Sequence, residues 1–473
     1  MWSASQVADA TKGRAQGSWN ATRIAIDSRA IQAGDLFVAL KGERFDGHDY
    51  VDEALKKGAV AVLVSDLPES KKTLPHVLVD DTTKALVDLA VYNRARSKAK
   101  VIGVTGSVGK TGTKEALKIA FSVHGVTYAT QGNLNNHIGL PLCLANLSTD
   151  TQFAIFEMGM NHAGEISYLT RLVHPDVAII TTVEAVHLEF FDSVEAIADA
   201  KSEIMEGLPE YGVIVLNRDN RYYARCEQNA KKLNVSRIMD FGSHAQAAFR
   251  LLDYQTTKTG SRMRIATPEG EMDVSLGVIG RHWAMNALAT LAAVHATGQD
   301  VKRSADALRE FAEPEGRGKF YPLPVPEGKG EYILIDDCYN ASPSSMSAAF
   351  AKLEELSKGG ASPHRRIAVL GDMLELGIRA PQFHAELSQD IALRNIDKVY
   401  VCGPLMKHLY DALDDAKQGG YAPDSASLLA LVMHDIREYD IVLIKGSNGS
   451  KMKIIRDALK AVAYPTKEKQ YAV

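Results

Sequence analysis

The chain has 473 residues, with 54 Lys and Arg against 58 Asp and Glu and a formal net charge of −4. Its 46% hydrophobic and 24% charged residues are typical of a soluble globular protein with more than one domain. It has no basic block that would hold nucleic acid, and no stretch approaches the roughly 20 apolar residues that cross a bilayer.

The first two regions are distinguished by their apolar runs. Residues 1–97 contain the strand-like runs GDLFVALKG and GAVAVLVS and close with a predicted helix, TTKALVDLAVYNRAR. Residues 98–312 alternate helices with the runs KVIGVTG, FAIFEMG, DVAIITTV and GVIVLNRDN, which are typical of a parallel sheet covered on both faces. This second region ends in an alanine-rich helix, RHWAMNALATLAAVHATG.

The third region, residues 313–473, opens with EPEGRGKFYPLPVPEGKGE, whose prolines and glycines are interpreted as a linker. The strands YILIDD, RRIAVLGD, KVYVCG and DIVLIKG follow, each before a predicted helix, with helices expected from Ser344 and near Phe383–Ala392. Such alternation predicts right-handed crossovers and a second doubly wound sheet. The expected fold class is therefore α/β in three domains, with a smaller N-terminal α/β domain, a central parallel sheet and a C-terminal Rossmann-like sheet.

The cysteines and the first residues bear on the compartment. Cys143, Cys226, Cys338 and Cys402 are widely spaced with no Cys-x-x-Cys pair, which argues against a metal ribbon or a disulfide scaffold and favours a reducing cytosol. The opening MWSASQVADATKG lacks the basic flank and apolar run of a secretory signal. We expect a cytoplasmic monomer that binds no nucleic acid and does not insert into membranes.

The turn between KVIGVT and the predicted helix KTGTKEALKIAFSVHG has the sequence of a phosphate-binding loop. Gly106–Thr111 reads GSVGKT, a shortened pattern, because Val104 stands where a glycine is expected. Backbone N–H groups and the positive helix end would bind phosphate oxygens, with Lys110 on the β/γ-phosphates and Thr111 on Mg²⁺. The alternative is a turn that only joins strand to helix. No Asn-Lys-x-Asp guanine motif is present, so ATP is expected, and the central domain is predicted to be P-loop ATPase-like.

Several ionisable residues follow the predicted strands. Glu157 ends FAIFEMG and is a candidate acidic Mg²⁺ ligand, although it could be an exposed turn residue. His187 in HLEFF and Lys201 in ADAKSE, taken alone, are more typical of a structural histidine and a solvated helix face. Asp336 and Asp337 end the first strand of the third region, at the sheet edge where open α/β sheets bind ligands.

A series of motifs occurs in the order of a known family. They are TGSVGKT, FEMGM, HLEFF, AKSEI, RHWAMNALA, EGRG, DDCYNASPSSM, VLGDMLELG and VLIKGS, and they resemble the Mur ligases of peptidoglycan synthesis. Upstream, IDSRAIQAGDLFVALKGERFDGHDYVDEALKKGAVAVLV resembles the N-terminal domain of these enzymes, so the resemblance covers nearly the whole chain. Folylpolyglutamate synthase shares the architecture but not this N-terminal domain.

The resemblance implies an ATP- and Mg²⁺-dependent ligase that joins D-alanyl-D-alanine to the terminal carboxylate of UDP-N-acetylmuramoyl-tripeptide. NLNNHIGLPL, YNASPSSM and GDMLELG resemble the member with this substrate, and the Asp-Asn-Pro-Arg sequence of the sister ligase is absent. The reaction would pass through an acyl phosphate and release ADP and phosphate, with the third domain closing as a lid about a hinge at Glu313–Gly318. Two alternatives remain: another ATP-using enzyme, such as a kinase, and a nucleotide-binding module without catalysis.

The resemblance also implies roles for particular residues. The catalytic group would be Lys110, Glu157, His187, Lys201 and Arg317, with metal bound by Thr111, Glu157, His187 and a carbamylated Lys201. ATP would contact Thr105, Gly106, Ser107, Val108, Gly109, Lys110, Thr111, Gly112, His282, Asn286, Arg317 and Asp337. The UDP-sugar would contact Ser28, Arg29 and the stretch that includes Lys41, Asp46, Gly47 and His48; Asn135 and Asn136 would face the central cleft, and Asn340, Ser345 and Lys445 would contact the remaining substrate.

Four positions depart from the family pattern. Trp283 replaces an asparagine, so that its indole either stacks on adenine or belongs to the core. Asn448 stands where Lys-Gly-Ser-Arg has its arginine, Lys453 replaces a glutamate, and His137 stands where an acidic residue is common.

Overall fold

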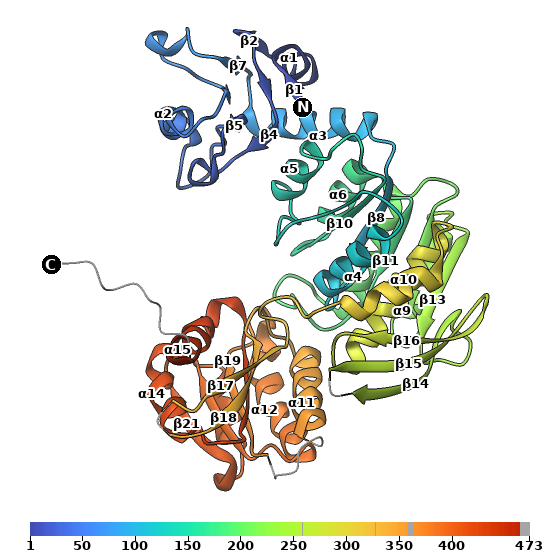
Figure 1. Ribbon diagram of the computed structural model, residues 1–473, viewed down its shortest axis with the longest axis vertical. Helices are drawn as coiled ribbons and strands as arrows, with labels where there is room; N and C mark the ends of the chain where they lie inside the picture. The colour runs from blue at the N-terminus through green and yellow to red at the C-terminus, as the bar shows by residue number, and fades with distance from the viewer. Residues whose placement is uncertain (258, 327, 358–363, 464–473) are drawn as a thin grey trace, which may run out of the picture.

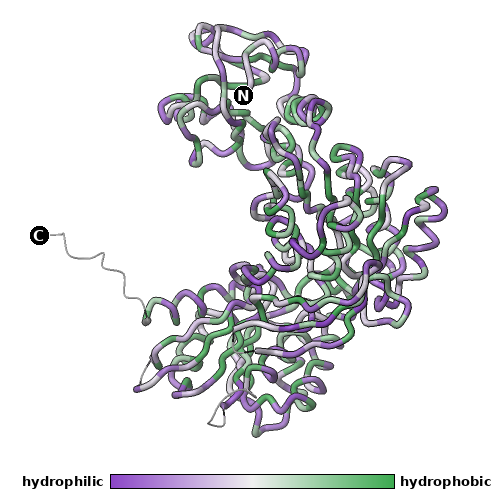
Figure 2. Tube along the Cα trace, turned by 45° about the vertical axis from the view of Figure 1, so that its right-hand side comes forward, coloured by the Kyte–Doolittle hydropathy of each residue, from purple (hydrophilic) through white to green (hydrophobic). Residues whose placement is uncertain are grey.

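The computed structural model describes residues 1–257, 259–326, 328–357 and 364–463. The described residues form three α/β domains that follow one another along the longest axis of the molecule (Figure 1). Buried apolar residues come mainly from the strands and from the helices that cover them, and Figure 2 colours the trace by the hydropathy of each residue. In the part of the chain that the structure describes, no helix is long and apolar enough to span a membrane.

The N-terminal domain contains a mixed sheet in the order β2-β7-β6-β5-β4 and a small β1-β3 ribbon. Its longest helix, α3, begins after the Asp81 side chain, which accepts hydrogen bonds from the backbone N–H groups of Thr83 and Lys84. The bounds are β1 Trp2–Ser3, α1 Ala4–Thr11, β2 Arg14–Gln16, β3 Asn20–Ala21, β4 Arg23–Ala25, β5 Asp35–Val38, α2 Val51–Lys56, β6 Ala61–Val64, β7 His76–Leu78 and α3 Thr82–Arg96.

Helix α3 joins this domain to the central one (Figure 1). It packs along α5 (Gly139–Ala145), and the buried Asn93 side chain donates to the carbonyl oxygens of Leu144 at 2.7 Å and Leu147 at 2.8 Å. Because a buried amide that lost these acceptors would remain unsatisfied, this contact fixes α3 to the central domain.

The central domain has nine strands among the described residues, in the order β16-β15-β14-β13-β12-β11-β8-β10-β9. The part of this sheet that runs from β14 through β8 to β9 is parallel. Helices α4, α9 and α10 cover one of its faces, and helices α5 to α8 cover the other. The bounds are β8 Lys100–Thr105, α4 Lys110–Ser122, β9 Thr127–Ala129, β10 Phe153–Glu157, α6 Glu165–Val173, β11 Val177–Ile180, α7 Val194–Ser202, β12 Val213–Asn217, α8 Tyr223–Lys232, β13 Arg237–Gly242, β14 Phe249–Thr257, β15 Gly260–Thr267, β16 Gly270–Leu276, α9 Arg281–Ala296 and α10 Val301–Ala307. The antiparallel extension β14-β15-β16 adds to the predicted parallel sheet.

The C-terminal domain has six strands within the described ranges, in the order β17-β18-β22-β19-β20-β21. All pairs are parallel except β17 with β18, which makes this the predicted doubly wound sheet with an antiparallel edge. The bounds are β17 Lys319–Pro324, β18 Glu331–Asp337, α11 Pro343–Ser357, β19 Arg366–Gly371, α12 Ala380–Leu393, β20 Lys398–Cys402, α13 Met406–Asp411, β21 Gln418–Ala422, α14 Ser425–Asp435, β22 Ile441–Lys445 and α15 Lys453–Ala463.

The interpretation of residues 313–331 as a linker is wrong for β17. Lys319–Pro324 pairs with β18 along its whole length, and Leu323 is fully buried while its neighbours face outward. An edge strand tolerates the two prolines because one side of it needs no ladder hydrogen bonds.

Gly112 permits the close contact between α4 and α9, and its replacement yields a stability prediction. A Cβ atom at Gly112 would lie 2.3 Å from Cζ3 of the buried Trp283. We expect Gly112→Ala to lower the free energy of unfolding, because overpacking costs about 1–3 kcal/mol and alanine regains roughly 1 kcal/mol of helix propensity. Urea unfolding measures this change. Lys118→Ala, at an exposed position of α4, is the control, and equal unfolding midpoints would contradict the prediction.

Candidate functional site

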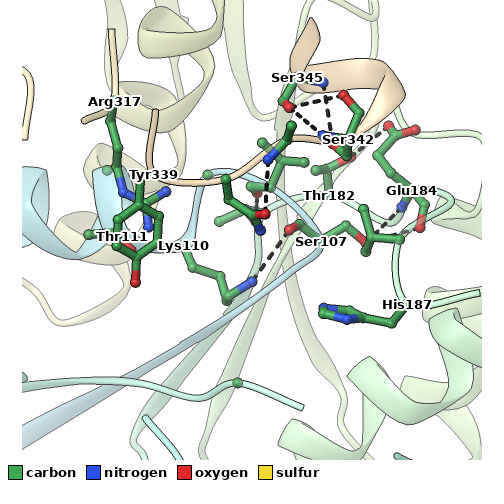
Figure 3. A pocket seen from close by; sticks show the side chains of 18 of the residues that line it. Ser107, Lys110, Thr111, Thr182, Glu184, His187, Arg317, Tyr339, Ser342 and Ser345 are labelled. Atoms are coloured by element: carbon green, nitrogen blue, oxygen red, sulfur yellow. Dashed lines mark hydrogen bonds between the residues drawn. The ribbon is translucent and has the colours of Figure 1, made fainter. Parts of the chain in front are cut away.

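A cleft of about 1310 Å³ lies between the central and C-terminal domains. It is lined by the loop after β8, the ends of β10 and β11, the start of α9 and the loop from β18 into α11 (Figure 3). The carboxyl ends of parallel strands from two sheets therefore face a common space, which is where open α/β sheets bind ligands.

The loop between β8 and α4 has the backbone of a phosphate cradle. Gly106 and Gly109 adopt φ angles of 149° and 91°, and a Cβ atom at Gly106 would lie 1.9 Å from the Thr181 hydroxyl oxygen. Only glycine fits there without strain. Lys110 donates from Nζ to the Gly106 carbonyl oxygen at 2.6 Å, and desolvation lowers its pKa. An anion in the loop would therefore meet a desolvated cation at a helix N-terminus.

Glu157 and Thr111 meet beside this loop. The Thr111 hydroxyl donates to Oε2 of Glu157 at 2.9 Å, and Nδ2 of Asn135 donates to Oε1 at 2.9 Å. Glu157 is 3% exposed at the end of β10, so the alternative of an exposed turn residue is wrong. A hydroxyl and a carboxylate at this position are hard oxygen ligands that suit Mg²⁺.

Lys201 lies in α7 with its side chain buried, 1% exposed. It is not on a solvated helix face, and no hydrogen-bond or ion-pair partner for its Nζ is found in the described part of the chain. Burial lowers its pKa well below the usual value, and the nearby Lys110 lowers it further. The amine is thus driven toward its uncharged form, which is the nucleophilic form of a lysine.

His187 contacts the C-terminal domain. Its Nδ1 lies 2.6 Å from Oε2 of Glu375, and this contact lowers the pKa of the Glu375 carboxyl. Both residues have left-handed backbones, with φ angles of 57° and 63°. Non-glycine residues adopt this conformation at some cost and are found more often at functional sites. The sequence did not identify Glu375 as a site residue, although it lies within the quoted motif GDMLELG.

The first turns of α9 lie against the phosphate-binding loop and the start of α4. His282 has its pKa lowered to about 3 by burial and by the charges of Lys352 and Lys445, so its ring is neutral at physiological pH. Trp283 is 4% exposed and belongs to the hydrophobic core, with its ring 5.2 Å from that of Phe311. The Asn286 Oδ1 atom lies 2.9 Å from the position of a Gly109 Cβ atom. Trp283 therefore packs in the core and also lines the cleft, beside His282 and Asn286.

Arg317 enters the cleft from the loop before β17. Its guanidinium lies over the Tyr339 ring, 4.1 Å from the ring centroid (Figure 3). Stacking of this kind orients the planar guanidinium while leaving its N–H groups available to an anion. Tyr339 was not predicted, because its pairing with Arg317 depends on the tertiary fold.

The remaining predicted residues of the C-terminal domain make contacts with one another. Lys445 donates from Nζ to Asp337 at 2.8 Å and to the Asn340 carbonyl oxygen at 3.0 Å, while burial raises the pKa of the Asp337 carboxyl. The Ser345 hydroxyl accepts a hydrogen bond from the backbone N–H of Ser342 at 2.9 Å, at the start of α11. These residues line the cleft, and Asn448 lines it too. Lys453 is exposed at the start of α15 and is not a lining residue.

Some predicted site residues do not line the cleft. Thr105 ends β8 and Gly106 begins the loop, and neither lines the cleft; the Thr105 hydroxyl donates to the Met158 carbonyl oxygen at 2.9 Å. Lys201 is buried and does not line the cleft either. The predicted UDP-sugar residues Ser28, Arg29, Lys41, Asp46, Gly47 and His48 all lie in the N-terminal domain. The Asp46 carboxylate accepts from the backbone N–H of His48 at 3.0 Å and lies 2.5 Å from its Nδ1, so part of this group is preorganised.

The contact between His187 and Glu375 leads to a prediction of modest size. Removing the acceptor by Glu375→Ala is expected to lower kcat about 1.5–5-fold, because partly exposed ion pairs contribute roughly 0.2–1 kcal/mol. Glu375→Gln keeps an acceptor and should lie closer to the unaltered chain. Steady-state kinetics test this order, and a larger loss in Glu375→Gln than in Glu375→Ala would contradict it.

Comparisons with known proteins cover most of the chain. The Mur ligase family catalytic domain matches residues 20–97, the Mur ligase middle domain residues 104–294, and the Mur ligase glutamate ligase domain residues 325–448. UDP-N-acetylmuramoyl-tripeptide–D-alanyl-D-alanine ligases from Rickettsia prowazekii and Escherichia coli are 36% and 34% identical, over 97% and 96% of this chain and 99% and 98% of theirs.

Two solved structures are similar over nearly the whole length. MurF from Acinetobacter baumannii has a TM-score of 0.84 at 31% identity, covering 97% of this chain and 98% of that one. MurF from Thermotoga maritima, in complex with ADP, has a TM-score of 0.77 at 28% identity, covering 94% and 98%.

Proposed function

The chain belongs to the Mur ligase family, and we propose that it joins D-alanyl-D-alanine to UDP-N-acetylmuramoyl-tripeptide with ATP. It forms a carbon–nitrogen bond in a precursor of peptidoglycan and releases ADP and phosphate. The observation that carries this proposal is the pairing of Thr111 with Glu157 beside the phosphate loop, inside a cleft that two domains share. This arrangement supports binding of a nucleotide with its cation opposite a second substrate site.

We propose that ATP binds with its phosphates in the loop Gly106–Thr111. The Thermotoga maritima relative was solved in complex with ADP, which supports binding of an adenine nucleotide by this chain. His282 and Asn286 would contact the base, and Arg317 the γ-phosphate. Since His282 stays neutral, it offers the base a hydrogen bond without a second positive charge.

The donors at the cleft fit Mg²⁺. Mg²⁺ commonly uses one or two carboxylates together with substrate phosphates and water, and Thr111 with Glu157 supplies such a set. No group of three His, Cys, Asp or Glu able to hold a metal occurs among the described residues. Bound Mg²⁺ would neutralise charge on the phosphates. His187 would contribute Nε2, the ring nitrogen that does not contact Glu375.

We propose that Lys201 carries a carbamate. An uncharged amine adds to carbon dioxide and releases a proton to solvent, and the product is an anion at a position where the unmodified lysine lacks a partner among the described residues. The carbamate would offset the charge of Lys110 and could reach the cation. The modification thus explains a buried lysine that sits beside another cation.

The chain's own residues then account for the chemistry. A carboxylate is a poor electrophile, so the tripeptide carboxylate attacks the γ-phosphorus of ATP, the bond from this phosphorus to the β–γ bridging oxygen breaks, and ADP leaves behind an acyl phosphate. Lys110 and Arg317 reduce the repulsion between the two anions and stabilise the charge of the transferring group. The dipeptide amine then attacks the acyl carbon, and phosphate leaves. Holding the reactants in position can contribute roughly 7–11 kcal/mol.

Each domain has a proposed ligand. Residues 1–97 would bind the UDP-sugar, 98–312 would bind ATP, and 313–473 would bind the dipeptide through Asn340, Ser345 and Lys445. Asn135 and Asn136 would face the tripeptide. Domain closure would exclude water from the acyl phosphate. We propose cytoplasmic action by a monomer.

A phosphate-release assay tests the function. With ATP and Mg²⁺ present, UDP-N-acetylmuramoyl-tripeptide and D-alanyl-D-alanine are added separately and together. We expect release only with both. Release with the dipeptide omitted would indicate another ATP-using enzyme, and no release under any condition would indicate a nucleotide-binding module.

A further inference from the structure

The segment Glu313–Gly318, which holds Arg317, is fastened to the C-terminal domain. The backbone N–H of Gly318 donates to the Asp336 carbonyl oxygen at 2.8 Å, and that of Tyr339 donates to the Gly316 carbonyl oxygen at 3.1 Å. Arg456 of α15 lies 3.6 Å from the Glu315 carboxylate. The segment that is expected to act as the hinge is therefore hydrogen-bonded to the C-terminal domain.

Lys352 of α11 forms hydrogen bonds to both ends of the segment Glu313–Gly318. Its Nζ donates to the Glu313 carboxylate at 2.9 Å and to the Gly318 carbonyl oxygen at 2.5 Å. The side chains of Lys352 and Glu313 are 2% and 7% exposed. A buried ammonium and a buried carboxylate each need the other, so this contact resists local opening.

The residue Phe311, just before the segment, packs in the core of the central domain. Phe311 is 3% exposed, and its ring meets that of Trp283 in the central core at 5.2 Å. Ala312 lies between Phe311 and Glu313 and is exposed. Phe311, which packs in the central domain, and Glu313, which is bonded to the C-terminal domain, are therefore separated by a single residue. Arg317 follows both of them in the chain.

We propose that Lys352 is the positioning residue for Arg317: it fixes the loop ends so that the guanidinium moves with the C-terminal domain and reaches the nucleotide on closure. The inference rests on the proposed contact of Arg317 with the γ-phosphate. Lys352 acts through the loop, because its Nζ is occupied by the carboxylate and the carbonyl oxygen at the ends of that loop. Stacking on Tyr339 then sets the angle of the guanidinium.

Two other roles for Lys352 make different predictions. Lys352 lines the cleft, so it could contact the nucleotide directly, or it could only stabilise the domain. In either case its loss would lower the rate whether or not Arg317 is present. A residue that acts through Arg317 loses its effect once Arg317 is gone.

A double-mutant cycle separates these roles. The paired substitution Glu313→Gln with Lys352→Met removes both buried charges, since Lys352→Met alone would leave a buried carboxylate unpaired. It is made in the unaltered chain and in Arg317→Ala, and kcat and the KM for ATP are measured with both substrates. Glu313→Gln alone, which keeps a neutral acceptor, serves as the milder variant.

We expect Arg317→Ala to lower kcat about 10²–10³-fold and the paired substitution to lower it roughly tenfold or more. In the Arg317→Ala background the paired substitution should change kcat by no more than about twofold. Glu313→Gln alone should give a smaller loss with the same dependence on Arg317. An equal loss in both backgrounds would overturn the inference. Full activity of Arg317→Ala would instead remove the proposed role of Arg317 itself, on which the inference rests.

Hydrogen exchange provides a readout that needs no nucleotide. The paired substitution should speed exchange at the amides of Gly318 and Tyr339, which hold the loop on the domain, while amides of β11 in the central domain stay unchanged. Unchanged exchange at Gly318 and Tyr339 would show that Lys352 does not hold the loop.

Discussion

Lys110→Met is expected to lower kcat about 10²–10³-fold, the loss typical of removing one preorganised donor to a transition-state anion. The Lys110 amine is desolvated at the start of α4 and donates a hydrogen bond to the Gly106 carbonyl oxygen. We expect it to turn from this oxygen toward a bound phosphate without a change in the loop. Methionine keeps the length of the side chain and removes the charge. Steady-state kinetics with both substrates measure the change.

The control for Lys110→Met is Lys118→Met on the exposed face of the same helix. Both variants should unfold at nearly the same urea concentration, because the described residues that accept hydrogen bonds from Lys110, Gly106 and Ser107, belong to the local loop. A Lys110→Met protein that turned over like Lys118→Met would contradict the proposed phosphate site.

Lys201→Met should separate activity from stability. The unmodified lysine is a buried amine without a partner in the described part of the chain, so an apolar side chain of similar length should leave the free energy of unfolding equal or higher. The carbamate would be lost at the same time. We expect kcat to fall about 10²-fold or more, in line with the loss of one charged group at a transferring phosphoryl group.

Two measurements check this second prediction. Urea unfolding compares Lys201→Met with the unaltered chain after bicarbonate has been removed, and carbon-13 NMR with labelled bicarbonate looks for a carbamate signal that the variant lacks. Lys232→Met, at an exposed position of α8, is the matched control. Full activity of Lys201→Met would remove the carbamate from the mechanism.

Much of the fold could be predicted because its signals are local. The helix predicted over residues 82–96 is α3 with the same bounds, and the strand, glycine loop and helix of the phosphate site are contiguous in sequence. The order of the family motifs along the chain predicted the order of the three domains. β17 was missed because its two prolines are typical of a linker, and only its pairing with β18 shows the strand.

The parts of the site that the sequence did not predict depend on contacts between distant residues. Glu375 meets His187 across 188 positions, and Lys352 meets Glu313 across 39, so neither pairing leaves a local pattern. The packing of Trp283 against Phe311 likewise joins distant residues. Glycine and proline content also does not show that the segment Glu313–Gly318 is hydrogen-bonded to the C-terminal domain.

The transfer of oxygen from the acid substrate to phosphate tests the central claim most directly. UDP-N-acetylmuramoyl-tripeptide is labelled with oxygen-18 in its terminal carboxylate and turned over with ATP, Mg²⁺ and D-alanyl-D-alanine, and the released phosphate is analysed by mass spectrometry. If the carboxylate is activated as an acyl phosphate, an oxygen-18 atom appears in the phosphate for each peptide formed. Phosphate without label, formed together with the peptide product, would contradict the mechanism.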